Sequence, residues 1–127
     1  SLQEKNVLNL PEGSYLALLS HSGSRGLGAA IAKHYSLLAR EVCRLPREAQ
    51  HFAWLDLNTE EGQEYWMSMN LAGDYARACH ERIHLNLAKA LGLKPLANVN
   101  NHHNFAWKEE ITPGRMAIVH RKGATPA

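Results

Sequence analysis

The segment His21-Ser22-Gly23-Ser24-Arg25-Gly26-Leu27-Gly28 combines residue types that bind phosphate. Its glycines let backbone N–H groups approach an anion closely, and a helix that follows would add unpaired N–H groups at its N-terminus. The hydroxyls of Ser22 and Ser24 can donate hydrogen bonds, and the guanidinium of Arg25 can donate two to one phosphate. The glycine spacing matches neither a Walker loop nor a dinucleotide-binding loop, so an ordinary turn with a solvated Arg25 is the alternative interpretation.

Histidine is the second source of chemistry, because the chain contains eight histidines and imidazole is the commonest side-chain metal ligand. His21 follows a predicted strand, and a rigid element can direct a ring toward a cleft. In Asn101-His102-His103-Asn104, neighbouring side chains of an extended segment point to opposite sides. We therefore expect one of the two histidines to bind a metal and the other to pack, and the spacing leaves open which. A structural histidine is the alternative at each position. Two ligands are too few for a complete site, so the others must be water or lie outside this chain.

Two further patterns are weaker. The run His80-Glu81-Arg82-Ile83-His84 formally matches the H-E-x-x-H pattern of zinc proteases. We do not expect a protease, because the pattern is short, no third ligand follows, and the helix face is expected to be packed. Arg121 and Lys122, next to Gly123, can bind phosphate at the end of a strand, with a solvated edge as the alternative.

A strand, a loop and a helix must position the first segment. Residues 14–20 form a short apolar run after turn residues, which is typical of a buried strand that ends at His21. Residues 29–42 are predicted to be a helix, and these side chains recur at helical spacing: Ile31, Tyr35, Leu38 and Val42. Residues 46–58 are predicted to be irregular, with these side chains covering the core: Phe52, Trp54, Leu55 and Leu57.

A long helix is predicted from about residue 60 to residue 91. Asn58-Thr59-Glu60-Glu61 offers an N-cap with an acid, and Gly92 and Pro95 supply the end. Gly62 and Gly73 each cost about 1 kcal/mol against Ala inside a helix, so a kink or two helices are the alternatives. The side chains expected on one packed face are Tyr65, Met69, Ala72, Ala76, Cys79, Ile83, Leu87 and Ala90.

The last third of the chain supplies the second pair of histidines. Residues 96–107 are too polar for a core strand and too rich in Asn and His for an ordinary linker. Residues 111–114 have turn chemistry, and residues 115–121 alternate Met116, Ile118 and His120 in the manner of a strand.

Composition limits the class of protein. Fourteen Lys and Arg against twelve Asp and Glu give a net charge of +2, so any polyanion must be held locally. No apolar run approaches the roughly 20 residues of a membrane span and no leader opens the chain, so a cytoplasmic protein without a membrane partner is expected. Cys43 and Cys79 lack metal or disulfide spacing and are expected to be buried thiols. Residues 1–127 are expected to form a single region of the α+β class, with mixed or antiparallel strands packed with long helices.

Three segments together resemble the RtcB-type RNA-splicing ligases. They are His21-Ser22-Gly23-Ser24-Arg25-Gly26-Leu27-Gly28, His102-His103-Asn104-Phe105-Ala106 and His120-Arg121-Lys122-Gly123-Ala124-Thr125. Their order and separation match the family, and residues 65–86 resemble its Ala-rich helix before the second motif. The resemblance covers nearly the whole chain and implies that it is part of the RtcB-like fold.

The resemblance also implies a reaction. The family joins RNA ends that carry a 2′,3′-cyclic phosphate or a 3′-phosphate to a 5′-hydroxyl, using GTP and manganese through a guanylylated histidine. It therefore implies Mn²⁺ and GTP as cofactors and RNA ends, such as tRNA halves or broken RNA, as substrates. An archease-like activator is an implied partner.

Site residues follow from the resemblance, motif by motif. His21 and His103 would be manganese ligands. Of the neighbouring pair His102 and His103, the resemblance thus assigns the metal to His103. His103 and Asn104 would contact the guanylate. The residues that would hold a phosphate of the RNA near the metals are Arg25, Ser22 and Ser24, with Lys122 as a weaker candidate.

The chain also departs from the family pattern. It has no Asp-x-x-Cys metal segment, no upstream Gly-Asn-His motif and no His-Gly-Ala-Gly-Arg motif that would carry the nucleophilic histidine. Ala78-Cys79-His80-Glu81-Arg82 stands where relatives often have a Trp-Ala-Asn-Arg-like run. We therefore expect an internal fragment of a longer ligase that is inactive alone. The alternatives are a non-catalytic module that binds RNA or a partner, and a metal-dependent phosphohydrolase.

Overall fold

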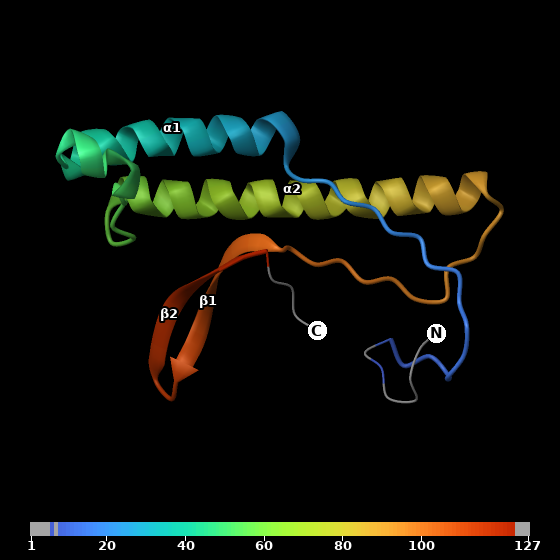
Figure 1. Ribbon diagram of the computed structural model, residues 1–127. Helices are drawn as coiled ribbons and strands as arrows, with labels where there is room; N and C mark the ends of the chain where they lie inside the picture. The colour runs from blue at the N-terminus through green and yellow to red at the C-terminus, as the bar shows by residue number, and fades with distance from the viewer. Residues whose placement is uncertain (1–5, 7, 124–127) are drawn as a thin grey trace. The chain divides into compact units, whose positions relative to one another are not determined.

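The computed structural model describes residue 6 and residues 8–123. The elements in chain order are α1 (Arg25–Cys43), the 3-10 helix η1 (Arg47–Phe52), α2 (Glu60–Ala90), β1 (Asn104–Thr112) and β2 (Arg115–Lys122) (Figure 1). They belong to two compact units, which we name the helical unit (His21–His80) and the hairpin unit (Ser1–Ser20 with Glu81–Ala127). Long helices with an antiparallel sheet confirm the predicted α+β class.

In the helical unit, α1 lies alongside the first part of α2 (Figure 1). Tyr35 joins the two helices, because its ring centroid lies 5.2 Å from that of Tyr65 and its hydroxyl lies 3.3 Å from the Ser68 hydroxyl. Ala39 on α1 and Ala72 on α2 are buried.

The predicted helix over residues 29–42 is confirmed, although α1 begins four residues earlier, at Arg25. Ile31, Tyr35 and Leu38 are partly covered as predicted. The placement of Val42 on this face is wrong, because its side chain is 56% exposed and Cys43 takes the covered position.

The connection between α1 and α2 differs from its prediction in two ways. Residues 47–52 form the 3-10 helix η1, where an irregular segment was predicted, and two aromatic side chains are placed differently. Phe52 is 70% exposed and Trp54 is 61% exposed, so the prediction that they cover the core is wrong, whereas Leu55 and Leu57 are partly covered. The Trp54 backbone is held instead: its N–H donates to Cys43 Sγ at 3.2 Å, and the thiol donates to its carbonyl at 3.0 Å.

Helix α2 starts at a tight junction. The hydroxyl of Thr59 accepts a hydrogen bond from the Gly62 N–H at 3.2 Å and donates one to the Asp56 carbonyl at 2.8 Å. A Cβ atom at Gly62 would lie 1.9 Å from that carbonyl oxygen, so only glycine fits there. The glycine that reduces helix propensity is therefore required by the loop that precedes the helix.

The predicted long helix is confirmed as one continuous element of 31 residues that passes through Gly62 and Gly73. Its end is a Schellman motif at Gly92, which has φ +65°, as predicted from the glycine. The Leu93 N–H donates to the Ala88 carbonyl at 2.8 Å and the Gly92 N–H to the Lys89 carbonyl at 3.2 Å.

The packed face of α2 follows the prediction only in its first part. The predicted positions that are covered or partly covered are Tyr65, Met69, Ala72, Ala76 and Cys79. Ile83, Leu87 and Ala90 are exposed, contrary to the prediction, and the covered positions are His84 and Ala88. Ala72, Ala76, His80, His84 and Ala88 form a covered row in steps of four residues, which winds around the helix because a turn has 3.6 residues.

Residues 14–20 do not form the predicted buried strand. No strand includes them, and Leu16 and Leu19 are 84% and 92% exposed. A strand needs a hydrogen-bonding partner, and the only sheet within residues 8–123 joins β1 to β2. The prediction rested on apolar character alone, which does not supply that partner.

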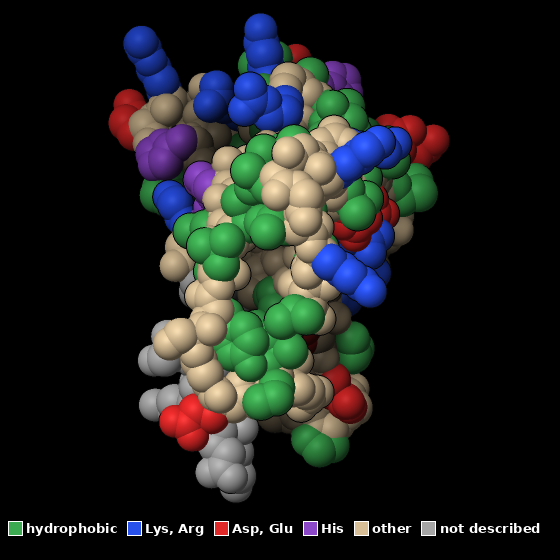
Figure 2. All heavy atoms as spheres, turned by 90° about the vertical axis from the view of Figure 1, so that its right-hand side faces the viewer, with side chains coloured by type: hydrophobic (Ala, Val, Ile, Leu, Met, Phe, Trp, Pro, Cys, Tyr) green, Lys and Arg blue, Asp and Glu red, His purple; other side chains and the backbone are tan. Residues whose placement is uncertain are grey.

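Few side chains are buried in the part of the chain that the structure describes. The buried hydrophobic residues are Ala39, Ala72, Ala76 and Ala88. Large apolar side chains lie at the surface at the end of α2 and after it, including Leu85, Leu91 and Leu96, which are 62%, 61% and 72% exposed. Figure 2 looks from the side on which α2 ends and shows hydrophobic side chains gathered on that face. None of the described helices is long and apolar enough to cross a membrane.

The hairpin is antiparallel, with a register that runs from Asn104 opposite Lys122 to Thr112 opposite Arg115. The predicted turn and the second strand are confirmed, and Gly114 in the turn has φ +76°. Strand β1 was not predicted, because its start is polar. Met116, Ile118 and His120 share one face as predicted by their alternation, but that face is exposed and Ala117, Val119 and Arg121 are partly covered.

Candidate functional site

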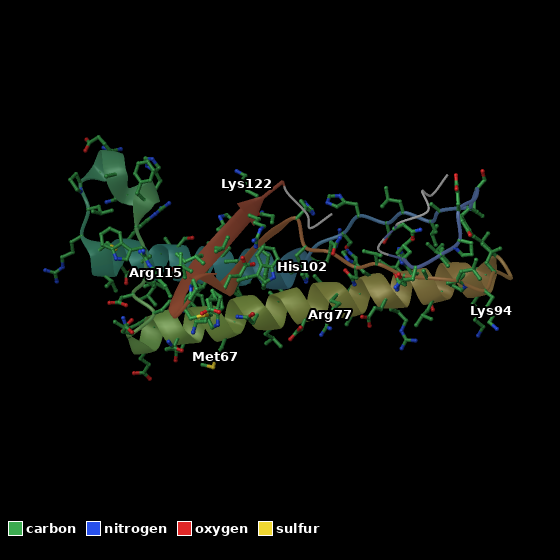
Figure 3. The ribbon with its side chains drawn as sticks, turned by 90° about the horizontal axis from the view of Figure 1, so that it is seen from below. Met67, Arg77, Lys94, His102, Arg115 and Lys122 are labelled. Carbon is green, nitrogen blue, oxygen red and sulfur yellow. The ribbon has the colours of Figure 1, made fainter. Side chains whose placement is uncertain are left out.

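The predicted site residues fall into two groups, one in each unit. His21, Ser22, Ser24 and Arg25 belong to the helical unit, where they lead into α1. The group in the hairpin unit, His103, Asn104 and Lys122, lies at the end of the hairpin opposite its turn. Figure 3 labels Arg115 and Lys122 at the two ends of β2.

The Gly- and Ser-rich segment of the helical unit is a shorter loop than predicted. Residues 21–24 are irregular, and α1 starts at Arg25, which has the unusual φ of +55° for a residue with a side chain. The Gly28 N–H donates to the Ser24 carbonyl at 3.3 Å, so Gly28 lies in the first turn rather than in the loop. His21 does not follow a strand, which removes the rigid platform that was predicted for it.

Gly28 is needed because Ser24 lies against it. A Cβ atom at Gly28 would lie 1.8 Å from Ser24 Oγ and 2.8 Å from Ser24 Cβ, whereas Gly26 has open space. The Ser24 side chain makes no capping hydrogen bond to the helix. Its hydroxyl therefore lies against the first turn of α1 without serving as the helix cap.

Arg25 lies near Tyr75 of α2 and is exposed. The hydrogen bond between Tyr75 and Cys79 raises the pKa of the Tyr75 phenol, and the charge of Arg25 opposes that rise. The ion pairs found within residues 8–123 are Arg77–Asp74 and Arg121–Glu109, and neither involves Arg25. An exposed guanidinium outside these pairs is suited to a phosphate.

In the hairpin unit, the backbone on either side of Asn104 is fixed. The Gly123 N–H donates to the His103 carbonyl at 2.6 Å, which extends the ladder one step beyond the pair of Asn104 and Lys122. Gly123 has φ +70°, a conformation that glycine adopts without strain. The second and third motif segments are thus held side by side by backbone pairing.

The two neighbouring histidines have different surroundings. The ring of His102 stacks on Phe105 with centroids 5.0 Å apart, and Phe105 lies 5.3 Å from Trp107. His102 is partly covered, whereas His103 is exposed. The expectation that one of the pair packs is met by His102.

Arg121 is engaged on the partly covered face of the hairpin. Its guanidinium makes two hydrogen bonds to the Glu109 carboxylate, at 2.5 and 2.7 Å, and lies 5.2 Å from the ring centroid of Trp107. The hydrogen bond from Arg121 holds the pKa of Glu109 below its usual value. Arg121 is therefore paired with Glu109 within the hairpin. This does not support a role for Arg121 in the phosphate-binding pair that was predicted with Lys122.

The opposite face carries Asn104, His120 and Lys122. Asn104 and Lys122 are direct partners in the register, and the Nε2 atom of His120 lies 3.1 Å from Asn104 Oδ1. Sequence reasoning did not single out His120 for the site. Its position two residues before Lys122, on the same face of a strand, is the signal that could have done so.

The histidines of the H-E-x-x-H match do not support a zinc site. The Nε2 atom of His84 lies 2.8 Å from the Ser20 hydroxyl, so this nitrogen takes part in a hydrogen bond. Among the described residues, no group of three or more His, Cys, Asp or Glu side chains is placed to hold a metal ion. A metal held by His21 or His103 would need ligands from elsewhere.

Comparison with known proteins identifies the family. Residues 3–127 match the family model described as tRNA-splicing ligase RtcB. The chain belongs to this family. It is 30% identical to the tRNA-splicing ligase RtcB of Methanococcus maripaludis over 129 residues. This alignment covers 88% of this chain and 26% of that protein. It is 32% identical to the tRNA-splicing ligase RtcB of Methanocaldococcus jannaschii over 133 residues. This alignment covers 91% of this chain and 14% of that protein.

A eukaryotic relative covers almost the whole chain. RNA-splicing ligase RtcB homolog 1 of Entamoeba dispar is 29% identical over 141 residues, which cover 99% of this chain and 26% of that protein. The chain thus spans about a quarter or less of the curated relatives it matches. No solved structure matches it.

Proposed function

We propose that this chain is an internal part of a GTP- and manganese-dependent RNA ligase. The ligase would join RNA ends that carry a 2′,3′-cyclic phosphate or a 3′-phosphate to 5′-hydroxyl ends, in RNA repair or tRNA splicing. The observation that carries the proposal is the family match over residues 3–127. The exposed leucines of the hairpin unit support it, because they would be covered by further parts of a ligase.

In this proposal His21 and His103 are manganese ligands. Neutral imidazole is a suitable donor, and the exposure of His103, beside a His102 that stacks on Phe105, supports the choice between the two. The bound metal would supply Lewis-acid polarisation of phosphoryl oxygens. Fewer than three candidate ligands gather at any place in the described part of this chain, so the rest of the ligase completes the site.

His103 and Asn104 contact the guanylate in this proposal, and the phosphate contacts come from charged and hydroxyl groups. Arg25, Ser22 and Ser24 at the start of α1 hold an RNA phosphate, with Lys122 as a further contact on the hairpin. The Ser24 hydroxyl makes no capping bond, which leaves it suited to a ligand. No residue of this chain is assigned as the nucleophile, so the chain alone is inactive.

The test uses the full-length protein to which this chain belongs. Incubation with manganese and GTP labelled at the α-phosphate should transfer label covalently to the full-length protein and not to residues 1–127 alone. Addition of RNA with a 3′-phosphate and RNA with a 5′-hydroxyl should then give joined product. Phosphate release without joined RNA would show a phosphohydrolase, and RNA binding without either would show a non-catalytic module.

A further inference from the structure

The exposed face of the hairpin holds a hydrogen bond between two side chains of different motif segments. Asn104 lies at the start of β1 and His120 near the end of β2, and His120 Nε2 lies 3.1 Å from Asn104 Oδ1. Both side chains are exposed. The proposed function assigns Asn104 to the guanylate and gives His120 no part.

The register explains why the two side chains meet. The direct partner of His120 across the hairpin is Ala106, and the direct partner of Asn104 is Lys122. A methyl group opposite the imidazole leaves room for the ring to lean toward the diagonal neighbour, which lies within reach of a long side chain. The diagonal contact therefore depends on a small residue at position 106.

The chemistry of the bond fixes the role of each atom. A carboxamide oxygen only accepts hydrogen bonds, so His120 Nε2 carries the proton and donates it. The amide is then held by its oxygen, and its NH₂ group keeps two donors for another partner. Lys122, the direct partner of Asn104, adds a positive charge beside these donors.

We infer that His120 is a positioning residue that holds the Asn104 amide, so that its NH₂ group donates to an acceptor atom of the bound nucleotide. The inference rests on the proposed contact between Asn104 and the guanylate. It adds that the recognised atom is an acceptor, such as a phosphoryl or carbonyl oxygen, and that Lys122 lies beside it. Without His120, Asn104 would spend part of its time in rotamers that point the NH₂ group elsewhere.

The test is a double-mutant cycle in the full-length ligase, with the KM for GTP and kcat measured separately. His120→Ala should raise the KM for GTP roughly fivefold to tenfold, as expected for the loss of one oriented hydrogen bond. His120→Gln keeps an N–H donor and should recover most of the loss. In an Asn104→Ala background, His120→Ala should have no further effect. Met116→Ala, on the same exposed face but near the turn, is the matched control and should leave the KM unchanged.

The outcomes separate this inference from the function on which it rests. If Asn104→Ala leaves the KM unchanged, the assignment of Asn104 to the nucleotide is wrong, and the positioning role of His120 is overturned with it. If Asn104→Ala raises the KM but His120→Ala has no effect or an additive one, only the positioning role is overturned. Thermal unfolding of each variant identifies any loss of folded protein, and His120→Gln provides the second variant if His120→Ala is unstable.

Discussion

The hydroxyl of Ser20 lies 2.8 Å from the Nε2 atom of His84, sixty-four positions later in the chain. This bond ties the segment that leads to the first motif to helix α2. It also occupies the nitrogen that a zinc protease would present to its metal. The H-E-x-x-H match is thus accounted for by a structural histidine.

Ser20→Ala should loosen the segment that ends at Ser20. Removing the hydroxyl leaves His84 Nε2 without this partner, and a side-chain hydrogen bond of this kind contributes about 1 kcal/mol. Hydrogen exchange of residues 14–20 should become faster by several fold. Ser14→Ala, at an exposed position of the same segment, is the control. Equal exchange in both variants would show that the bond does not hold the segment.

Gly28→Ala should impair the proposed phosphate contact at the start of α1. The new Cβ would lie 1.8 Å from Ser24 Oγ, so Ser24 must move, at a cost of about 1–3 kcal/mol. The affinity of the full-length protein for RNA with a 3′-phosphate should fall severalfold, because Ser24 leaves its position.

Gly26→Ala is the matched control for Gly28→Ala, because it lies in the same turn and has open space around it. It should change the affinity less than twofold. Ser24→Gly combined with Gly28→Ala should restore stability but not RNA affinity. A Gly26→Ala variant as impaired as Gly28→Ala would contradict the role given to Ser24.

Gly62→Ala should be among the most destabilising glycine substitutions. The added Cβ would meet the backbone carbonyl of Asp56 at 1.9 Å and the Leu57 Cα at 2.9 Å, and backbone cannot move aside as a side-chain tip can. A loss of about 2–3 kcal/mol in the free energy of unfolding is expected. Denaturant unfolding of Gly62→Ala and Gly26→Ala compares a crowded and an open glycine. An unchanged free energy of unfolding in Gly62→Ala would contradict the close approach of the Asp56 backbone to Gly62.

Glu109 should make the hairpin sensitive to acid. Its pKa is lowered in the folded state by the hydrogen bond from Arg121, so the folded state favours the ionised form. The resulting stability is present above the unfolded pKa of about 4.3 and is lost as the pH falls through the lower, folded pKa. The effect should be small, because the two side chains are 34% and 36% exposed and water screens them.

Glu109→Gln should therefore destabilise the protein at pH 7 and have a smaller effect at pH 3. Thermal unfolding from pH 3 to pH 7 measures the difference between wild type and variant. Glu81→Gln, at an exposed position of α2, should show no such dependence. A Glu109→Gln effect that is constant over this range would contradict the ion pair as its cause.

Helical periodicity predicted the two long helices, and glycine chemistry predicted the end of α2 at Gly92 and the turn at Gly114, because these signals are local. The strand over residues 14–20 was wrong because pairing depends on a partner that apolar character does not reveal. Strand β1 was missed because Asn104 and its polar neighbours do not look like a strand until β2 is beside them. The contact of His120 with Asn104 depends on the register of that pairing, which single-residue patterns do not contain.

In the proposed ligase reaction, His103 and not His102 binds the metal and the guanylate. The direct measurement is the joining of RNA with a 3′-phosphate to RNA with a 5′-hydroxyl by the full-length protein, with manganese and GTP. His103→Ala should abolish joined product, whereas His102→Phe, which keeps an aromatic ring against Phe105, should retain most of it. Full joining activity in His103→Ala would contradict the proposed role of His103.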